Sequence, residues 1–159
     1  MSKVLGILRN WGVAAAAVGC MVMPVMAQDF KLAMSSPPTS MDPHFQNITT
    51  NANVIEHMFE PLVMRSADGK LAPGLAESWT NVNNLTWDFK IRRGAKFSDG
   101  SPVTVEDVIY SLERPANVKN SPASFTQYTR SIASKRAVDA QTLRITTTAP
   151  TPLLPDDLV

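Results

Sequence analysis

Cysteine and histidine are nearly absent from this chain of 159 residues, and neither sign of charge is in clear excess. The single cysteine is Cys20, and the two histidines are His44 and His57. One thiol can make neither an intrachain disulfide nor a zinc site of several thiolates. The 15 basic residues nearly balance the 14 acidic ones, and without the first 27 residues the counts are 13 and 14, a net charge of −1. A general nucleic-acid binder needs a basic face to neutralise phosphates, so that class of protein is not expected.

Long apolar runs are also missing, apart from one at 11–23 that is shorter than the roughly 20 residues needed to span a membrane. Two basic residues, Lys3 and Arg9, precede this run and are the only charges in the first 27 residues. Small or compact side chains flank a cleavage point after Ala27. These features predict a signal peptide at 1–27, export from the cytoplasm, and a soluble mature chain of 132 residues.

Cys20 leaves one alternative open, which is attachment of a lipid to its thiol. A bacterial lipoprotein signal usually has leucine where Ala17 stands, and the site at Ala27 lies just downstream, so cleavage after Ala27 is favoured. Cleavage there would leave no thiol in the mature chain. Cysteine nucleophiles and thiolate metal sites would then be excluded from 28–159.

Alternating apolar residues predict several strands in the mature part of the chain. The segment 86–91 places Trp87, Phe89 and Ile91 on one face. Trp79 and Trp87 are expected to be packing anchors, because each buries a large apolar area. Strands are also predicted at 29–34, 62–65, 70–71 and 142–147, with a short extended piece at 95–98.

Helical spacing of apolar residues and end signals predict three helices. The first covers 50–59, and the second runs from Thr104 to about residue 113. The hydroxyl of Thr104 and the carboxylate of Asp107 are placed to cap each other's backbone at its start. One or two further helical turns are predicted within 125–132.

The last ten residues, 150–159, are a proline-rich connection followed by the start of a new helix with acidic residues in its first turn. A domain is not expected to stop at such a point. We therefore expect the chain to be a truncated product or a fragment of a longer protein.

Four short motifs occur in an order and spacing that are similar to those of a known family. They are Ser-Met-Asp-Pro-His at 40–44, Met-Phe-Glu-Pro-Leu-Val at 58–63, the segment 71–79 that ends in Glu-Ser-Trp, and the segment 85–100 that ends in Phe-Ser-Asp-Gly. On these motifs the chain resembles solute-binding protein family 5, the periplasmic binding proteins for dipeptides, oligopeptides, nickel complexes and related solutes. The predicted helix at 104–114 and the run 132–145 extend the resemblance over nearly all of the mature chain.

The resemblance implies an α/β, periplasmic-binding-protein-like fold of two lobes that close on a ligand. This chain would supply part of the first lobe with the family's extra N-terminal subdomain, and the second lobe would be absent. We therefore divide the chain into a signal peptide at 1–27 and a truncated N-terminal portion of the solute-binding domain at 28–159. Most residues that set ligand specificity would lie in the missing lobe.

The resemblance also implies which residues face the ligand. They are Gln46 and Asn47, which follow the Asp-Pro motif, and Ser124 and Phe125, which follow a Glu-Arg pair at 113–114. The implied function is the extracytoplasmic substrate-binding component of an ABC importer, which captures peptides or similar small solutes for inner-membrane permease subunits. The full-length protein is expected to be a periplasmic monomer. No catalytic residue, metal or cofactor is implied.

The sequence gives weaker support to four other functions. The main alternative is a receptor or adaptor that keeps the binding fold but senses solutes instead of importing them. A metal site would have to use His44 and His57, which lack a companion at metal-ligand spacing. A hydrolase would have to pair carboxylates such as Asp42 and Glu60, with His57 as the base. It could instead recruit Ser98 near Asp99, but no nucleophile-elbow motif is present. A nucleic-acid site would have to use the basic residues Arg92, Arg93 and Lys96. They lie beside a turn, where charges usually face solvent.

Overall fold

The computed structural model describes residue 31 and residues 33–159. The signal peptide predicted at 1–27, its cleavage point and Cys20 lie outside the described residues, and so does half of the strand predicted at 29–34. The residues of that strand that are described have no regular secondary structure. Residues 34–159 form a single folded unit.

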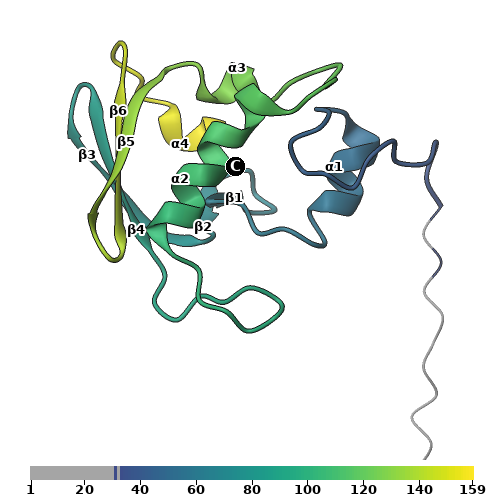
Figure 1. Ribbon diagram of the computed structural model, residues 1–159, viewed down its shortest axis with the longest axis horizontal. Coiled ribbons are helices and arrows are strands. Elements are labelled where there is room, and N and C mark those ends of the chain that lie inside the picture. The colour runs from purple at the N-terminus through teal and green to yellow at the C-terminus, as the bar shows by residue number, and fades with distance from the viewer. Residues whose placement is uncertain (1–30, 32) are drawn as a thin grey trace, which may run out of the picture. The chain divides into compact units, whose positions relative to one another are not determined.

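A four-stranded antiparallel sheet is the main element of this unit (Figure 1). Its strands lie in the order β3 (Ala76–Asn83), β4 (Thr86–Ile91), β6 (Thr142–Thr147) and β5 (Ile132–Asp139). The two central strands, β4 and β6, coincide with the strands predicted at 86–91 and 142–147, so both predictions are confirmed.

The edge strands β3 and β5 are not among the strands that the sequence predicts. Most of their side chains are exposed, so apolar and polar residues do not alternate in a regular way. Each edge strand also has two register shifts where it pairs with its neighbour. Such a shift displaces the two-residue period of a strand, which removes the signal on which the prediction depends.

The core lies between one face of the sheet and the helix α2 (Val105–Glu113) (Figure 1). Phe89 of β4 and Leu143 and Ile145 of β6 are fully buried there. They meet Val105 and Val108, the two buried residues of α2. These side chains alternate along their strands, so the other face of β4 and β6 carries polar residues.

Trp79 and Trp87 are half-buried and pack against this cluster, which confirms the packing role predicted for them. The rings of Trp87 and Phe89 lie 6.5 Å apart between centroids. The indole N–H of Trp87 donates a hydrogen bond of 3.2 Å to the carbonyl oxygen of Thr151. The predicted face of Trp87, Phe89 and Ile91 is therefore the core face of β4.

The capping box predicted for α2 is present. The backbone N–H of Asp107 donates to the hydroxyl of Thr104, and a carboxylate oxygen of Asp107 accepts from the backbone N–H of Thr104 at 2.8 Å. The helix ends at Glu113, and a 3-10 turn, η1 (Arg114–Asn117), follows it with Pro115 at its start. The predicted start and end of this helix are confirmed.

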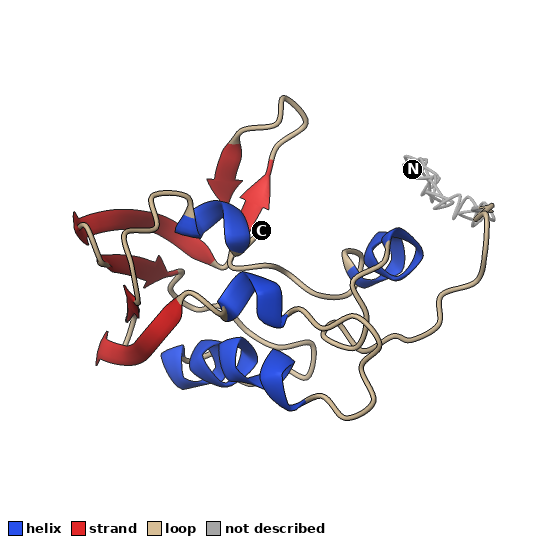
Figure 2. Ribbon diagram, turned by 90° about the horizontal axis from the view of Figure 1, so that it is seen from above, coloured by secondary structure: helices blue, strands red, loops and turns tan. Residues whose placement is uncertain are grey.

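The remaining elements are short. β1 (Val63–Arg65) and β2 (Leu71–Pro73) form a separate antiparallel pair at the strands predicted at 62–65 and 70–71 (Figure 2). Gly69 lies in the turn between them, with a φ of +82°. α3 (Thr126–Thr129) lies within the predicted 125–132. α4 (Leu154–Asp157) is the helix start expected near the end of the chain, and its Leu154 is fully buried. The piece expected at 95–98 makes only an isolated bridge, between Lys96 and Pro102.

The helix predicted at 50–59 is shorter than expected. The observed helix, α1 (Thr49–Ile55), is followed by a turn at residues 56–58. Met58 and Phe59 are each about half exposed, at 50% and 46%. Short helices depend on packing of an apolar face, and the last predicted turn has little surface to pack against. Among the described residues, no helix has the length and apolar character needed to cross a membrane.

Candidate functional site

The two pairs of predicted ligand residues, far apart in sequence, lie beside each other in the structure. Gln46 forms a parallel β-bridge with Ala123, and the backbone N–H of Asn47 donates to the carbonyl oxygen of Ala123 at 3.0 Å. The hydroxyl of Ser121 donates to the carbonyl oxygen of Phe45 at 2.6 Å. We call residues 42–47 the Asp-Pro loop. These bonds join it to the residues just before Ser124 and Phe125.

Asn47 has one side-chain partner among the described residues. Its amide Nδ2 donates a hydrogen bond of 3.0 Å to the phenol oxygen of Tyr128, in α3. The side-chain oxygen of Gln46 accepts a hydrogen bond of 2.8 Å from the hydroxyl of Thr39. Both amides are half-buried, so each has part of its surface open to solvent.

Phe125 belongs to a small aromatic group. Its ring lies 6.0 Å from the ring of Tyr128, and the edge-on ring of His44 lies 6.4 Å away on the Asp-Pro loop. Such pairs add modest stability beyond the area they bury. Phe125 is half-buried, so it contributes both to this packing and to the surface near Asn47.

Ser124 has a local structural role. Its hydroxyl donates to the carbonyl oxygen of Pro115 at 2.9 Å, and it accepts from the backbone N–H of Thr126 at 3.1 Å. These bonds attach the start of α3 to the 3-10 turn. A contact between Ser124 and ligand stays a prediction.

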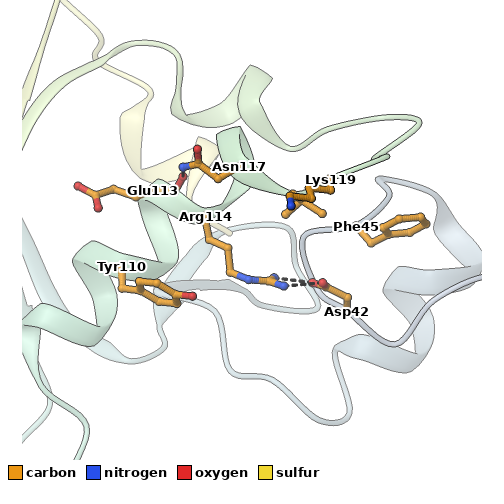
Figure 3. Close-up of a pocket in the computed structure, with 8 residues that line it drawn as sticks. Asp42, Phe45, Tyr110, Glu113, Arg114, Asn117 and Lys119 are labelled. Carbon is orange, nitrogen blue, oxygen red and sulfur yellow. Dashed lines mark hydrogen bonds and ion pairs between the residues drawn. The ribbon is translucent and has the colours of Figure 1, made fainter.

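The Asp-Pro loop is held to the end of α2 by an ion pair between Asp42 and Arg114 (Figure 3). Two nitrogens of the guanidinium each donate to a different carboxylate oxygen, both at 2.5 Å. This forked geometry is the strongest form of a hydrogen-bonded ion pair. The backbone N–H of His44 adds a bond of 2.9 Å to the same carboxylate.

These contacts shift the pKa values of Asp42 and His44. The hydrogen bonds from Arg114 lower the pKa of Asp42 to about 2, against the opposing effect of its partial burial. Burial, with the adjacent charge of Arg114, lowers the pKa of His44, although Asp42 acts in the opposite direction. Arg114 can only donate, so the Nδ1 atom of His44, 3.2 Å away, is the acceptor. His44 is therefore neutral at pH 7 and carries its hydrogen on Nε2.

The Asp42 carboxylate predicts a specific acid sensitivity. Its folded pKa of about 2 lies below the ordinary value of 3.8, so its stabilising effect is complete above pH 3.8 and is lost as the pH falls through 2. We expect Asp42→Asn to lower the free energy of unfolding by about 1–2 kcal/mol at pH 7 and to flatten its decline between pH 4 and pH 2. Urea unfolding across this pH range measures both. An unchanged slope in the variant would contradict the assignment.

A surface hollow of about 480 Å³ lies beside the ion pair (Figure 3). Its lining residues come from the Asp-Pro loop, α2 and the segment after it: Asp42, Phe45, Tyr110, Glu113, Arg114, Asn117, Val118 and Lys119. In Figure 3 the Tyr110 ring lies beside Arg114. None of the four predicted ligand residues lines this hollow, so the hollow and the Asn47–Phe125 surface are separate features.

Several of the residues considered for a metal site or a hydrolase site have other partners in the structure. Within the described part of the chain, no three histidine, cysteine, aspartate or glutamate side chains group to hold a metal ion. His44 faces the positive charge of Arg114, and His57 is exposed. Asp42 is paired with Arg114, and Glu60 is paired with Arg92 at 2.7 Å. The two carboxylates considered for a hydrolase are thus each bound by an arginine.

Sequence reasoning missed Tyr128 and the pairing of Asp42 with Arg114. Both partners of the ion pair stand in motifs, Asp-Pro and Glu-Arg, that the sequence does mark. They lie 72 residues apart, and no pattern along the chain links them. Tyr128 carries no signal, since one tyrosine in a predicted helical turn is more often a packing residue.

Comparison with known proteins places the chain in a family. The model of the bacterial extracellular solute-binding proteins, family 5, middle region, matches residues 70–158, more than half of the chain. The periplasmic oligopeptide-binding protein OppA of Escherichia coli is 35% identical over 129 residues, which are 71% of this chain and 24% of that protein. The glutathione-binding protein GsiB of Pectobacterium atrosepticum is 33% identical over 151 residues, 93% of this chain and 29% of that protein.

The fold matches as well. The solved structure of the Escherichia coli murein tripeptide binding protein MppA superposes with a TM-score of 0.68 at 31% identity, over 76% of this chain and 27% of that one. The chain thus spans about a quarter of the length of the relatives it matches. The resemblance inferred from the four motifs and the periplasmic-binding-protein-like fold are both confirmed. The chain belongs to the bacterial extracellular solute-binding proteins of family 5.

Proposed function

We propose that this chain is part of the substrate-binding component of an ABC importer that captures peptides or similar small solutes. One observation carries the proposal: the relatives are named for binding oligopeptides, a murein tripeptide and glutathione, which are all peptides or peptide-like. They are binding proteins, and no enzymatic activity is proposed.

The surface formed by Asn47 and Phe125 suits such ligands. An amide offers hydrogen bonds to the polar backbone of a peptide, and an aromatic ring offers an apolar face for its side chains. Gln46 lies next to Asn47 and adds a second amide. The three residues come from two chain segments, which the bridge and the backbone hydrogen bond to Ala123 hold side by side.

We also propose export to the periplasm. The OppA and MppA relatives are named as periplasmic proteins, and residues 1–27 have the charge and apolar pattern of a signal peptide. Mass spectrometry of the periplasmic fraction is expected to find Gln28 as the first residue. A lipid-modified Cys20 at the terminus would contradict cleavage after Ala27.

Ligand capture is tested by isothermal titration of the complete protein with trialanine and with glutathione. We expect micromolar binding of at least one, and a loss of about tenfold in affinity for Asn47→Ala and for Phe125→Ala. The matched controls are Asn84→Ala and Phe97→Ala, which remove the same side chains from exposed positions elsewhere. These are expected to change affinity less than twofold. Failure of the unmodified protein to bind any peptide would contradict the proposal.

Cell uptake separates import from the alternative, a solute-sensing receptor or adaptor with the same fold. Loss of the gene is expected to abolish uptake of the bound peptide if membrane permease subunits are the partners. If uptake stays normal after loss of this gene, in cells that have no other peptide-binding protein of this kind, the receptor is favoured.

A further inference from the structure

The side-chain amide of Asn47 is held at one end only. Its Nδ2 donates to the Tyr128 hydroxyl, while its Oδ1 accepts no hydrogen bond from any described residue. An amide has a donor end and an acceptor end, and use of the donor end fixes where the acceptor end points. The free oxygen lies on a residue that is partly exposed to solvent.

Tyr128 is itself held in place without any ligand. Its ring packs on Phe125 at 6.0 Å, and Phe125 packs on His44 at 6.4 Å. His44 accepts from Arg114, which is bound to Asp42. This chain of contacts starts and ends on the Asp-Pro loop, because Tyr128 returns to Asn47. The direction of the Asn47 amide is therefore set by the fold, before ligand arrives.

We propose that Tyr128 is a positioning residue that orients Asn47 so that its Oδ1 accepts a hydrogen bond from an N–H group of a bound peptide. This inference rests on the proposed peptide-binding function. The N–H groups of a peptide backbone and its terminal ammonium are the ligand donors that such an oxygen recognises. Tyr128 does not touch the ligand, and it acts through Asn47 alone.

A double-mutant cycle tests this dependence. Trialanine is titrated into the complete protein and into three variants, Tyr128→Phe, Asn47→Ala and the double variant. Tyr128→Phe is expected to weaken binding about fivefold to tenfold, because it leaves the amide free to rotate. In the Asn47→Ala background the same substitution is expected to have no further effect. The control Tyr110→Phe removes the chain's other tyrosine hydroxyl and is expected to change affinity less than twofold.

A purely structural Tyr128 would give a different result. Its loss would then weaken binding equally in both backgrounds, and equal effects would overturn the proposal while leaving the peptide-binding function in place. A measurement without ligand adds a second test. The Asn47 side-chain amide signals in the NMR spectrum are expected to shift and to show greater mobility in Tyr128→Phe but not in Tyr110→Phe. Unchanged signals would overturn the positioning role even if no peptide bound.

Discussion

Replacing Phe89 with alanine is expected to lower the free energy of unfolding by about 3–5 kcal/mol, the largest effect of any single change considered. Phe89 is fully buried and lies on a central strand of the sheet. Its cross-strand partners are Trp79 on β3 and Leu143 on β6. Truncation removes the burial energy of the ring and leaves a cavity that the flanking strands cannot close, because each is tied to β4 by backbone hydrogen bonds.

Urea unfolding followed by the fluorescence of Trp79 and Trp87 measures this loss, because both tryptophans belong to the sheet. Phe97→Ala is the matched control. Phe97 is 47% exposed in the loop after β4, so its loss is expected to cost less than about 1 kcal/mol. Similar costs for the two substitutions would contradict the placement of the core between β4, β6 and α2.

Replacing Arg114 with alanine is expected to cost about 2–3 kcal/mol and to weaken peptide binding about tenfold. The change leaves the half-buried carboxylate of Asp42 without its forked partner and removes the donor to His44. Freed from α2, the Asp-Pro loop would no longer hold Asn47 in one position. The affinity loss would thus arise at a residue that is not itself predicted to contact ligand.

Two variants separate the geometry of this pair from its charge. Arg114→Lys keeps a positive charge but cannot form the fork, so it is expected to recover less than half of the lost stability. Arg92→Ala breaks the similar pair with Glu60, whose side chains are more exposed, at 46% and 42%. That change is expected to cost less than about 1 kcal/mol and to leave binding unchanged. Equal effects of the Arg92 and Arg114 changes on affinity would contradict a special role for the Asp-Pro loop.

The sequence by itself determined the elements whose signal is local. β4 and β6 were predictable because a strand buried on one face must alternate apolar and polar residues. Phe89 and Ile91 alternate with polar residues in β4, and Leu143 and Ile145 do so in β6. The start of α2 was predictable because Thr104 and Asp107 carry a capping box within four residues. The family was predictable because four short motifs occur in the order and spacing typical of it, and the comparisons confirm it.

Only the tertiary structure decided the features that join distant segments. The edge strands β3 and β5 form by pairing with β4 and β6, and their own sequences carry no regular strand pattern. The helix at 50–59 is cut short because its last turn lacks a surface on which to pack.

The candidate site shows the same division. Motif order led to Gln46, Asn47, Ser124 and Phe125, and the structure brings these four residues together. It also supplies what holds them, an ion pair across 72 residues and a tyrosine hydrogen bond across 81. Contacts over such separations depend on how the whole chain folds, since side-chain chemistry at one position does not state which distant position it will meet. The sequence therefore identified the candidate site residues, and the fold determined which distant residues they contact.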